Sequence, residues 1–448
     1  MTSALRAALG SAGSSYTLGN ASIPAAVTAG LERELPADDS GLITCDVVVH
    51  SGKIAAITEA GTTGDALDCR GRMLLPRFHD LHTHLDMGHL ADKSPNPEGT
   101  HFGAVLARDK FRAYAIARGD AWRDADLERR MEFSIRCACA HGSIALRSHL
   151  DSLPEQAEQS WRVFERLRDR WRGQIELQGA ALLPVDHYLT EYGTTLADRV
   201  AASNGVLGGV TRLSGQGHGP AGPKLRTAIE RILQLASERN LDVDFHVDET
   251  GDSSSRSLDL IIDAVRSTGF RGRVTCGHCC ALAIRDEADA MRTVRACADL
   301  GISIVSLPHC NLYLQDRGVN RTPRWRGITL LHEFAQAGVP IAIASDNCRD
   351  YFYAYGDHDQ LANFALAALA AHLDRPYGRW LPTICSTPAA IIGSGDAGLI
   401  QVDQAANFIV FSARRFSELL ARPQSDRIVF NRGVVSDVAL PPFSDLDS

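Results

Sequence analysis

Two histidines in the stretch RFHDLHTHLDMGH, residues 77–89, have the spacing of a metal-binding pair. His82 and His84 are separated by one residue and follow an apolar run. Side chains alternate between the two faces of a β-strand, so residues at this spacing point to the same side of an extended segment. The pair could bind a divalent metal ion, and the alternative interpretation is a hydrogen-bonded pair of core histidines.

Two residues elsewhere in the chain can complete such a site. His246 lies in the apolar run LDVDFHV, and Asp346 ends the run PIAIASD. Three imidazoles and one carboxylate can hold a divalent ion and leave a position for water. We therefore predict one divalent metal ion per chain, bound by His82, His84, His246 and Asp346. The donor set suits Fe²⁺ and Zn²⁺ alike and does not choose between them.

The other two histidines of the opening stretch are not expected to be ligands. His79 lies three residues before His82, which places it on the other face of an extended strand. His89 falls beyond the strand, in a loop. We expect both to be neighbours of the site or solvated side chains.

Two further residues could carry proton transfer. Glu249 lies three residues after His246, where the strand must give way to its loop. A carboxylate just outside the ligand set could move a proton between metal-bound water and a substrate. His278 ends another apolar run and could hydrogen-bond a substrate carbonyl or the attacking hydroxide. The alternatives are a solvated loop glutamate and a core histidine beside three cysteines.

These side chains require elements that bring distant strand ends together. Eight apolar runs with polar ends occupy residues 73–84, 143–151, 175–184, 205–213, 241–249, 273–279, 302–311 and 340–347. After a longer first interval they recur roughly every 30 to 35 residues, about the length of one βα unit. Residues 223–240 show the helical spacing that should separate two such strands. The pattern predicts an α/β fold, a TIM-type (β/α)8 barrel with its active site at the polar strand ends.

The two ends of the chain show a different sequence pattern, one that is typical of short β-strands. Residues 45–57, CDVVVHSGKIAAI, predict a hairpin that turns at Ser51-Gly52. The runs ANFIVFSA and DRIVFNRGVV near the C-terminus are similar. Because chain termini often lie close together, we expect one small β-sandwich domain built from residues 1–74 and 391–448, flanking a barrel of residues 75–390.

Composition and charge limit the kinds of ligand that the protein is expected to bind. The chain has 448 residues and a formal net charge of −8, without a block of lysine or arginine, so neither nucleic acid nor a membrane surface is expected to bind. The longest apolar run, residues 362–373, is too short to span a bilayer. Residues 1–15 resemble a loose tail rather than a signal peptide. We predict a cytoplasmic protein with a small-molecule partner.

The eleven cysteines are scattered through apolar runs, which predicts buried, reduced thiols. Cys276 and Cys279 have CxxC spacing, but no second pair of cysteines or histidines accompanies them at zinc-site spacing. A zinc or redox role for this pair is therefore the weaker interpretation.

Several blocks together resemble the amidohydrolase superfamily, and specifically its cytosine deaminase branch with the N-isopropylammelide hydrolases. The blocks are HTHLD, RSHLDS, HVDE, GHC, NLYLQDR, RWRGITLL and ASDNCRDYFYAYG. The resemblance implies a mononuclear site with the four ligands predicted above. Residues 205–213 contain no lysine that could bridge a second metal ion. The resemblance further implies that Asp346 accepts the water proton, that Glu249 protonates a ring nitrogen, and that His278 stabilises the hydroxide and the tetrahedral intermediate.

Three departures from the cytosine deaminase pattern concern substrate contacts. The glutamine that contacts the pyrimidine corresponds here to Val185, and the aspartate after the metal ligand corresponds to Asn347, as in the ammelide hydrolases. Met87 stands where many relatives carry lysine. Since an apolar side chain cannot make the lost hydrogen bonds, these three substrate-binding candidates do not specify cytosine.

The sequence thus predicts a metal-dependent hydrolytic deaminase that acts on an amino-substituted pyrimidine or related N-heterocycle and releases ammonia. The alternatives are a hydrolase of a cyclic amide or of an N-alkylamino triazine-type ring, and a metal-free scaffold protein. The presence of all four ligand residues argues against the scaffold. The resemblance also allows a homo-oligomer.

Overall fold

The structure is a computed structural model that describes residues 7–8, 13–31, 33–96, 98–117, 124–374, 376–423 and 426–447. Most of the N-terminal stretch interpreted as a loose tail lies outside these residues.

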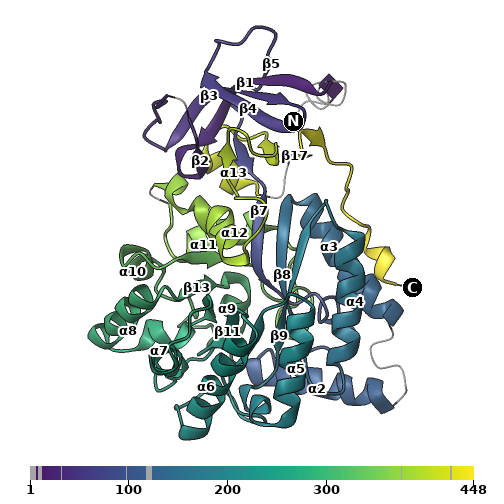
Figure 1. The fold of residues 1–448 in the computed structure, drawn as a ribbon, viewed down its shortest axis with the longest axis vertical. Helices are drawn as coiled ribbons and strands as arrows, with labels where there is room; N and C mark the ends of the chain where they lie inside the picture. Colours follow the sequence, from purple (N-terminus) through teal and green to yellow (C-terminus); the bar gives the residue numbers. More distant parts are fainter. Residues whose placement is uncertain are drawn as a thin grey trace.

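Eight parallel strands carry the polar strand ends noted in the sequence (Figure 1). One sheet has the order β7-β8-β9, with β7 (Phe78–Thr83), β8 (Ser143–Asp151) and β9 (Glu176–Leu182). A second sheet has the order β10-β11-β12-β13-β14, with β10 (Leu207–Val210), β11 (Val243–Val247), β12 (Val274–His278), β13 (Ser303–Ser306) and β14 (Ile341–Ile343). Isolated parallel bridges link the sheets at Ala180–Val206 and Pro184–Val210, and again at Thr83–Asp346. The predicted α/β class with parallel strands is confirmed.

Helices follow these strands along the chain, and most of them lie outside the strands (Figure 1). They are α2 (His101–Ala117), α3 (Asp124–Ala140), α4 (Ala157–Arg170), α5 (Glu191–Ala202), α6 (Pro223–Glu238), α7 (Ser257–Thr268), α8 (Glu287–Leu300), α9 (Pro308–Leu314), α10 (Leu331–Gln336), α11 (Gln360–Ala370) and α12 (Ser386–Ile392). Helix α6 has proline in its first turn and buries Leu225, Ile229 and Ile232, which share one face at the predicted spacing. None of the described helices has both the length and the apolar character needed to cross a membrane.

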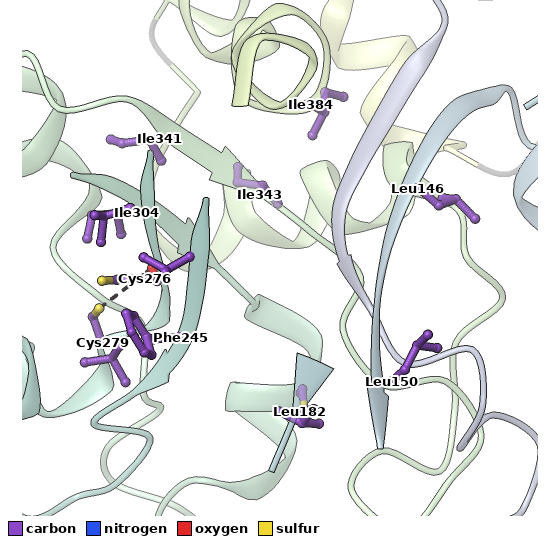
Figure 2. Close-up of a cluster of buried hydrophobic side chains, with 14 of the residues drawn as sticks. Leu146, Leu150, Leu182, Phe245, Cys276, Cys279, Ile304, Ile341, Ile343 and Ile384 are labelled. Atoms are coloured by element: carbon purple, nitrogen blue, oxygen red, sulfur yellow. Dashed lines mark hydrogen bonds between the residues drawn. The ribbon is translucent and has the colours of Figure 1, made fainter. Parts of the chain in front are cut away.

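The strands and their helices share a large apolar core (Figure 2). Cys276 and Cys279 lie in this core close to Phe245 and Ile304, and burial raises the pKa of both thiols well above the ordinary value. All eleven cysteines are free and buried. The CxxC pair therefore packs as small apolar side chains, because a metal or redox site needs thiolates.

Short strands from the two chain ends pack together beside the parallel strands. One sheet has the order β4-β3-β1-β5, with β1 (Ser15–Pro24), β3 (Leu42–His50), β4 (Lys53–Glu59) and β5 (Leu67–Asp68). Another has the order β18-β17-β16-β6, with β6 (Leu74–Pro76), β16 (Phe408–Phe411), β17 (Arg427–Asn431) and β18 (Val434–Val435). Strand β2 (Thr28–Ala29) pairs with β15 (Ile400–Gln401), and α13 (Phe416–Ala421) lies between β16 and β17 in the chain.

A single apolar cluster joins these terminal segments. It includes Ile23 and Val47 from the N-terminal strands and Phe408 and Ile428 from the C-terminal ones. The predicted hairpin at Ser51-Gly52 is confirmed between β3 and β4, and both turn residues have positive φ, 49° and 78°. A two-residue turn with positive φ at both positions matches the twist of the flanking strands.

Candidate metal centre and active site

Four side chains converge at the ends of β7, β11 and β14. His246 Nε2 lies 3.1 Å from His82 Nε2 and 3.2 Å from His84 Nε2. Asp346 Oδ1 lies 3.1 Å from His84 Nε2 and 3.5 Å from His82 Nε2. Ligand atoms around a tetrahedral ion with bonds of about 2.1 Å would be about 3.4 Å apart. The spacing of these four atoms therefore matches a tetrahedral metal site.

The chemistry of these donors fits a cation better than a hydrogen-bonded core. Both carboxylate oxygens of Asp346 are buried and accept no hydrogen bond from a described residue. Burial favours the neutral acid, but the imidazoles of His82 and His84 hold the pKa of Asp346 well below its usual range. A neutral imidazole carries one N–H, so three clustered Nε2 atoms and a carboxylate cannot satisfy one another fully. One shared divalent ion would satisfy all four lone pairs.

Hydrogen bonds and one close approach fix these strand ends. The Asp346 amide donates to the His82 carbonyl at 2.8 Å, and Asp80 accepts bonds from the backbone and hydroxyl of Ser345. Burial raises the pKa of Asp80 to about 7. In β12, a Cβ placed on Gly277 would lie 3.1 Å from His82 Cε1. Glycine at this position therefore leaves room for the His82 ring.

Glu249 and His278 form a second cluster against the first. Glu249 Oε1 lies 3.5 Å from His278 Nδ1, and Oε2 lies 3.2 Å from His101 Nε2. The Asn311 amide nitrogen lies 2.9 Å from His278 Nδ1 and donates to Glu249 Oε1 at 3.4 Å. The Asn311 amide nitrogen can only donate, so the His278 Nδ1 that it contacts is the acceptor. His278 also offers a ring nitrogen to the same group of possible ligand atoms as His82, His246 and Asp346.

The protonation of Glu249 follows from its neighbours. Burial would raise its pKa, but His278 and His101 together lower it to about 2. The side chain is therefore an ionised carboxylate at neutral pH, ready to accept a proton.

A cavity opens onto both clusters. Its lining is His84, Met87, His101, Val105, Arg108, Leu182, Val210, Arg212, His246, Glu249, His278, Asn347 and Phe352. Met87 and Asn347 thus lie where substrate contacts were expected, and the Asn347 amide donates to Asp350 Oδ2 at 2.7 Å. Val185 does not line the cavity. It begins a 3-10 turn, Val185–Leu189, just after Pro184, and is fully buried against β10, while Leu182 takes the lining position.

The two remaining histidines of the opening stretch, expected to be neighbours of the site or solvated side chains, are both buried. His79 is fully buried, and burial lowers its pKa to about 4. The ring of His89 contacts the Ser134 hydroxyl at 3.0 Å. Neither residue belongs to the converging set, and the apolar core explains their burial.

Sequence reasoning missed three charged or titratable cavity residues: His101, Arg108 and Arg212. His101 and Arg108 lie on α2, in the long segment after β7, where no periodic pattern marks them. Arg212 lies two residues after the end of β10. This position close to a strand end could have identified Arg212 as a candidate site residue.

Comparisons with known proteins identify the family of the chain. Residues 193–429 match the Amidohydrolase family. The chain is 44% identical to a pterin deaminase of Rhizobium rhizogenes over 97% of this chain and 96% of that protein. It is 22% identical to an N-isopropylammelide isopropyl amidohydrolase of Pseudomonas sp. (strain ADP), over 84% and 87% of the two chains. Its fold is similar to that of 5-methylcytosine deaminase from Klebsiella pneumoniae, with a TM-score of 0.78, 22% identity and coverage of 94% and 96%. The chain belongs to the amidohydrolase family.

Proposed function

We propose that the protein is a metal-dependent hydrolytic deaminase of an amino-substituted N-heterocycle, with a pterin as the substrate ring. The observation that carries the proposal is the position of an ionised Glu249 beside His278, both opening onto the cavity that borders the converged ligand set. The pterin deaminase at 44% identity supports the choice of ring. The apolar lining, Met87, Val105, Leu182, Val210 and Phe352, suits the faces of a flat fused ring.

The proposed ligands are His82, His84, His246 and Asp346, and one divalent ion bound there would supply activation of water. Glu249 accepts one proton of the attacking water and delivers it to the ring nitrogen beside the amine-bearing carbon. Asp346 receives the second water proton and passes it to the departing amine, which leaves as ammonia. The His278 Nε2–H donates to the oxygen that attacks, so charge on that oxygen is stabilised. These transfers balance the hydrolysis of one C–N bond by one water molecule.

We also propose the complete architecture around this site. The bridges between β9 and β10 and between Thr83 and Asp346 support closure of the eight strands into a (β/α)8 barrel, residues 75–390. The shared apolar cluster of the terminal strands supports one β-sandwich domain formed by residues 1–74 and 391–448.

A screen for ammonia release tests the function. The metal-loaded protein would be offered pterin, cytosine, isocytosine, creatinine and N-isopropylammelide, and the product of each reaction identified by mass. We expect the protein to replace the 2-amino group of pterin by oxygen, which gives the 2,4-dioxo ring and releases ammonia. Release of isopropylamine alone would favour the N-alkylamino alternative, and no turnover of any ring would contradict the proposal.

A further inference from the structure

Two arginines line the same cavity as the ligand set. Arg212 is 6% exposed and Arg108 is 8% exposed. Arg212 lies two residues beyond β10, whose last residue, Val210, pairs with His246. The Arg212 side chain therefore comes from a segment directly beside a proposed metal ligand.

Arg212 has no direct ion pair among the described residues, although the carboxylates of Asp109, Asp151 and Asp186 lie near enough to act on its charge. Its guanidinium donates to the Gln216 carbonyl at 3.1 Å, and among the described residues no carboxylate lies within ion-pair distance of it. Burial, followed by the charge of Arg108, lowers its pKa to about 10, so the group is still protonated at neutral pH. A buried charge without a direct ion pair is costly, which makes an external anion a favourable partner.

Other buried arginines in this chain have better partners. Arg147 pairs with Asp244 at 2.8 Å and Arg427 pairs with Asp359 at 2.7 Å. Arg77 donates to three backbone carbonyls. Arg108 lies 3.1 Å from Asp109 Oδ1 and 3.7 Å from Asp151 Oδ1, so its charge is already balanced within the protein. Arg212 stands apart because it lines a cavity with a single carbonyl partner.

We propose that Arg212, supported by Arg108, binds a carboxylate group carried by the substrate ring, so that the preferred substrate is an anionic amino-heterocycle. A guanidinium presents paired N–H donors that match the two oxygens of a carboxylate. The acidic groups on the other side of the cavity do not oppose such a ligand. Glu249 lies within 3.5 Å of two imidazoles, and Asp346 belongs to the proposed metal ligands. The inference rests on the proposed function and extends it to the substituent.

Matched pterins separate charge from shape. The probes are pterin carrying a carboxylate or the neutral, similarly shaped carboxamide at position 6 or 7. We expect the metal-loaded protein to show a kcat/KM for one carboxylate isomer that is about tenfold or more above that of its carboxamide. Arg212→Gln should remove this preference, Arg212→Lys should keep part of it, and the surface control Arg226→Gln should keep it fully. Arg108 is less suitable for the test, because its loss also removes an ion-pair partner from Asp151.

A binding measurement that needs no turnover distinguishes failure of the anion site from failure of the proposed function. Calorimetry would compare the deaminated products, the 2,4-dioxo ring bearing the carboxylate and the same ring bearing the carboxamide, in the native protein and in Arg212→Gln. Tighter binding of the carboxylate, lost in the variant, supports the anion site even if no pterin is deaminated, and then only the proposed function fails. Equal affinity of the native protein for both products, or an unchanged preference in Arg212→Gln, would overturn the inference.

Discussion

At the residue scale, Glu249 lies beside the four converged side chains and contacts the imidazoles of His278 and His101. The HxH pair and the polar strand ends pointed to His82, His84, His246 and Asp346, because alternation along a strand fixes which residues share a side. The structure brings these four together. The sequence did not predict which residues contact Glu249. His101 reaches it from a helix, and no local pattern specifies a contact between segments so far apart in sequence.

Replacing Glu249 by Gln separates proton transfer from metal binding. The variant keeps the size and hydrogen-bonding shape of the side chain but cannot accept a proton. We expect kcat to fall by about 10² to 10⁴-fold while metal content stays close to that of the native protein. Metal analysis and initial rates on the same samples check this. Substantial turnover in the variant would assign the proton transfer to another residue.

At the element scale, the site depends on how closely β12 approaches β7. The apolar runs and their periodicity predicted all eight strands, but not this approach, which depends on the absence of one side chain at Gly277. The same limit explains Val185. The resemblance to cytosine deaminases suggested a cavity contact at this position, but the turn after Pro184 buries Val185 against β10.

Gly277→Ala should therefore weaken metal binding. The added methyl group would press on the His82 ring, so we expect the metal affinity to fall by about tenfold or more. The matched control is Gly395→Ala, because a Cβ there meets no heavy atom within 4 Å. Metal titrations of both variants check the expectation, with thermal unfolding to confirm that each is folded. Equal affinity in the two variants would show that β12 does not restrict His82.

At the scale of the whole molecule, one buried ion pair connects the C-terminal strands to the parallel-strand region. Arg427 in β17 pairs with Asp359, whose side chain caps α11, and also donates to the His141 carbonyl. The composition and texture of the two ends predicted a separate β region. They could not predict its attachment, since the pairing residues lie far apart in the chain.

Arg427→Met should destabilise the protein strongly, because it removes the guanidinium from a buried carboxylate. We expect a loss of about 3 to 5 kcal/mol in the free energy of unfolding. Arg172→Gln, which breaks an exposed pair with Asp169, should cost about 1 kcal/mol or less. Denaturant unfolding of both variants is the measurement. Similar losses would indicate that the Arg427 pair contributes no more than a surface contact.

In the proposed mechanism, hydrolysis depends on one divalent ion held by three histidines and Asp346. The most direct test is a metal titration of pterin deamination. Chelator treatment should abolish ammonia release without unfolding the protein, and one equivalent of Fe²⁺ or Zn²⁺ per chain should restore it, but not in His82→Ala. Turnover that persists in the metal-free, folded protein would contradict the account.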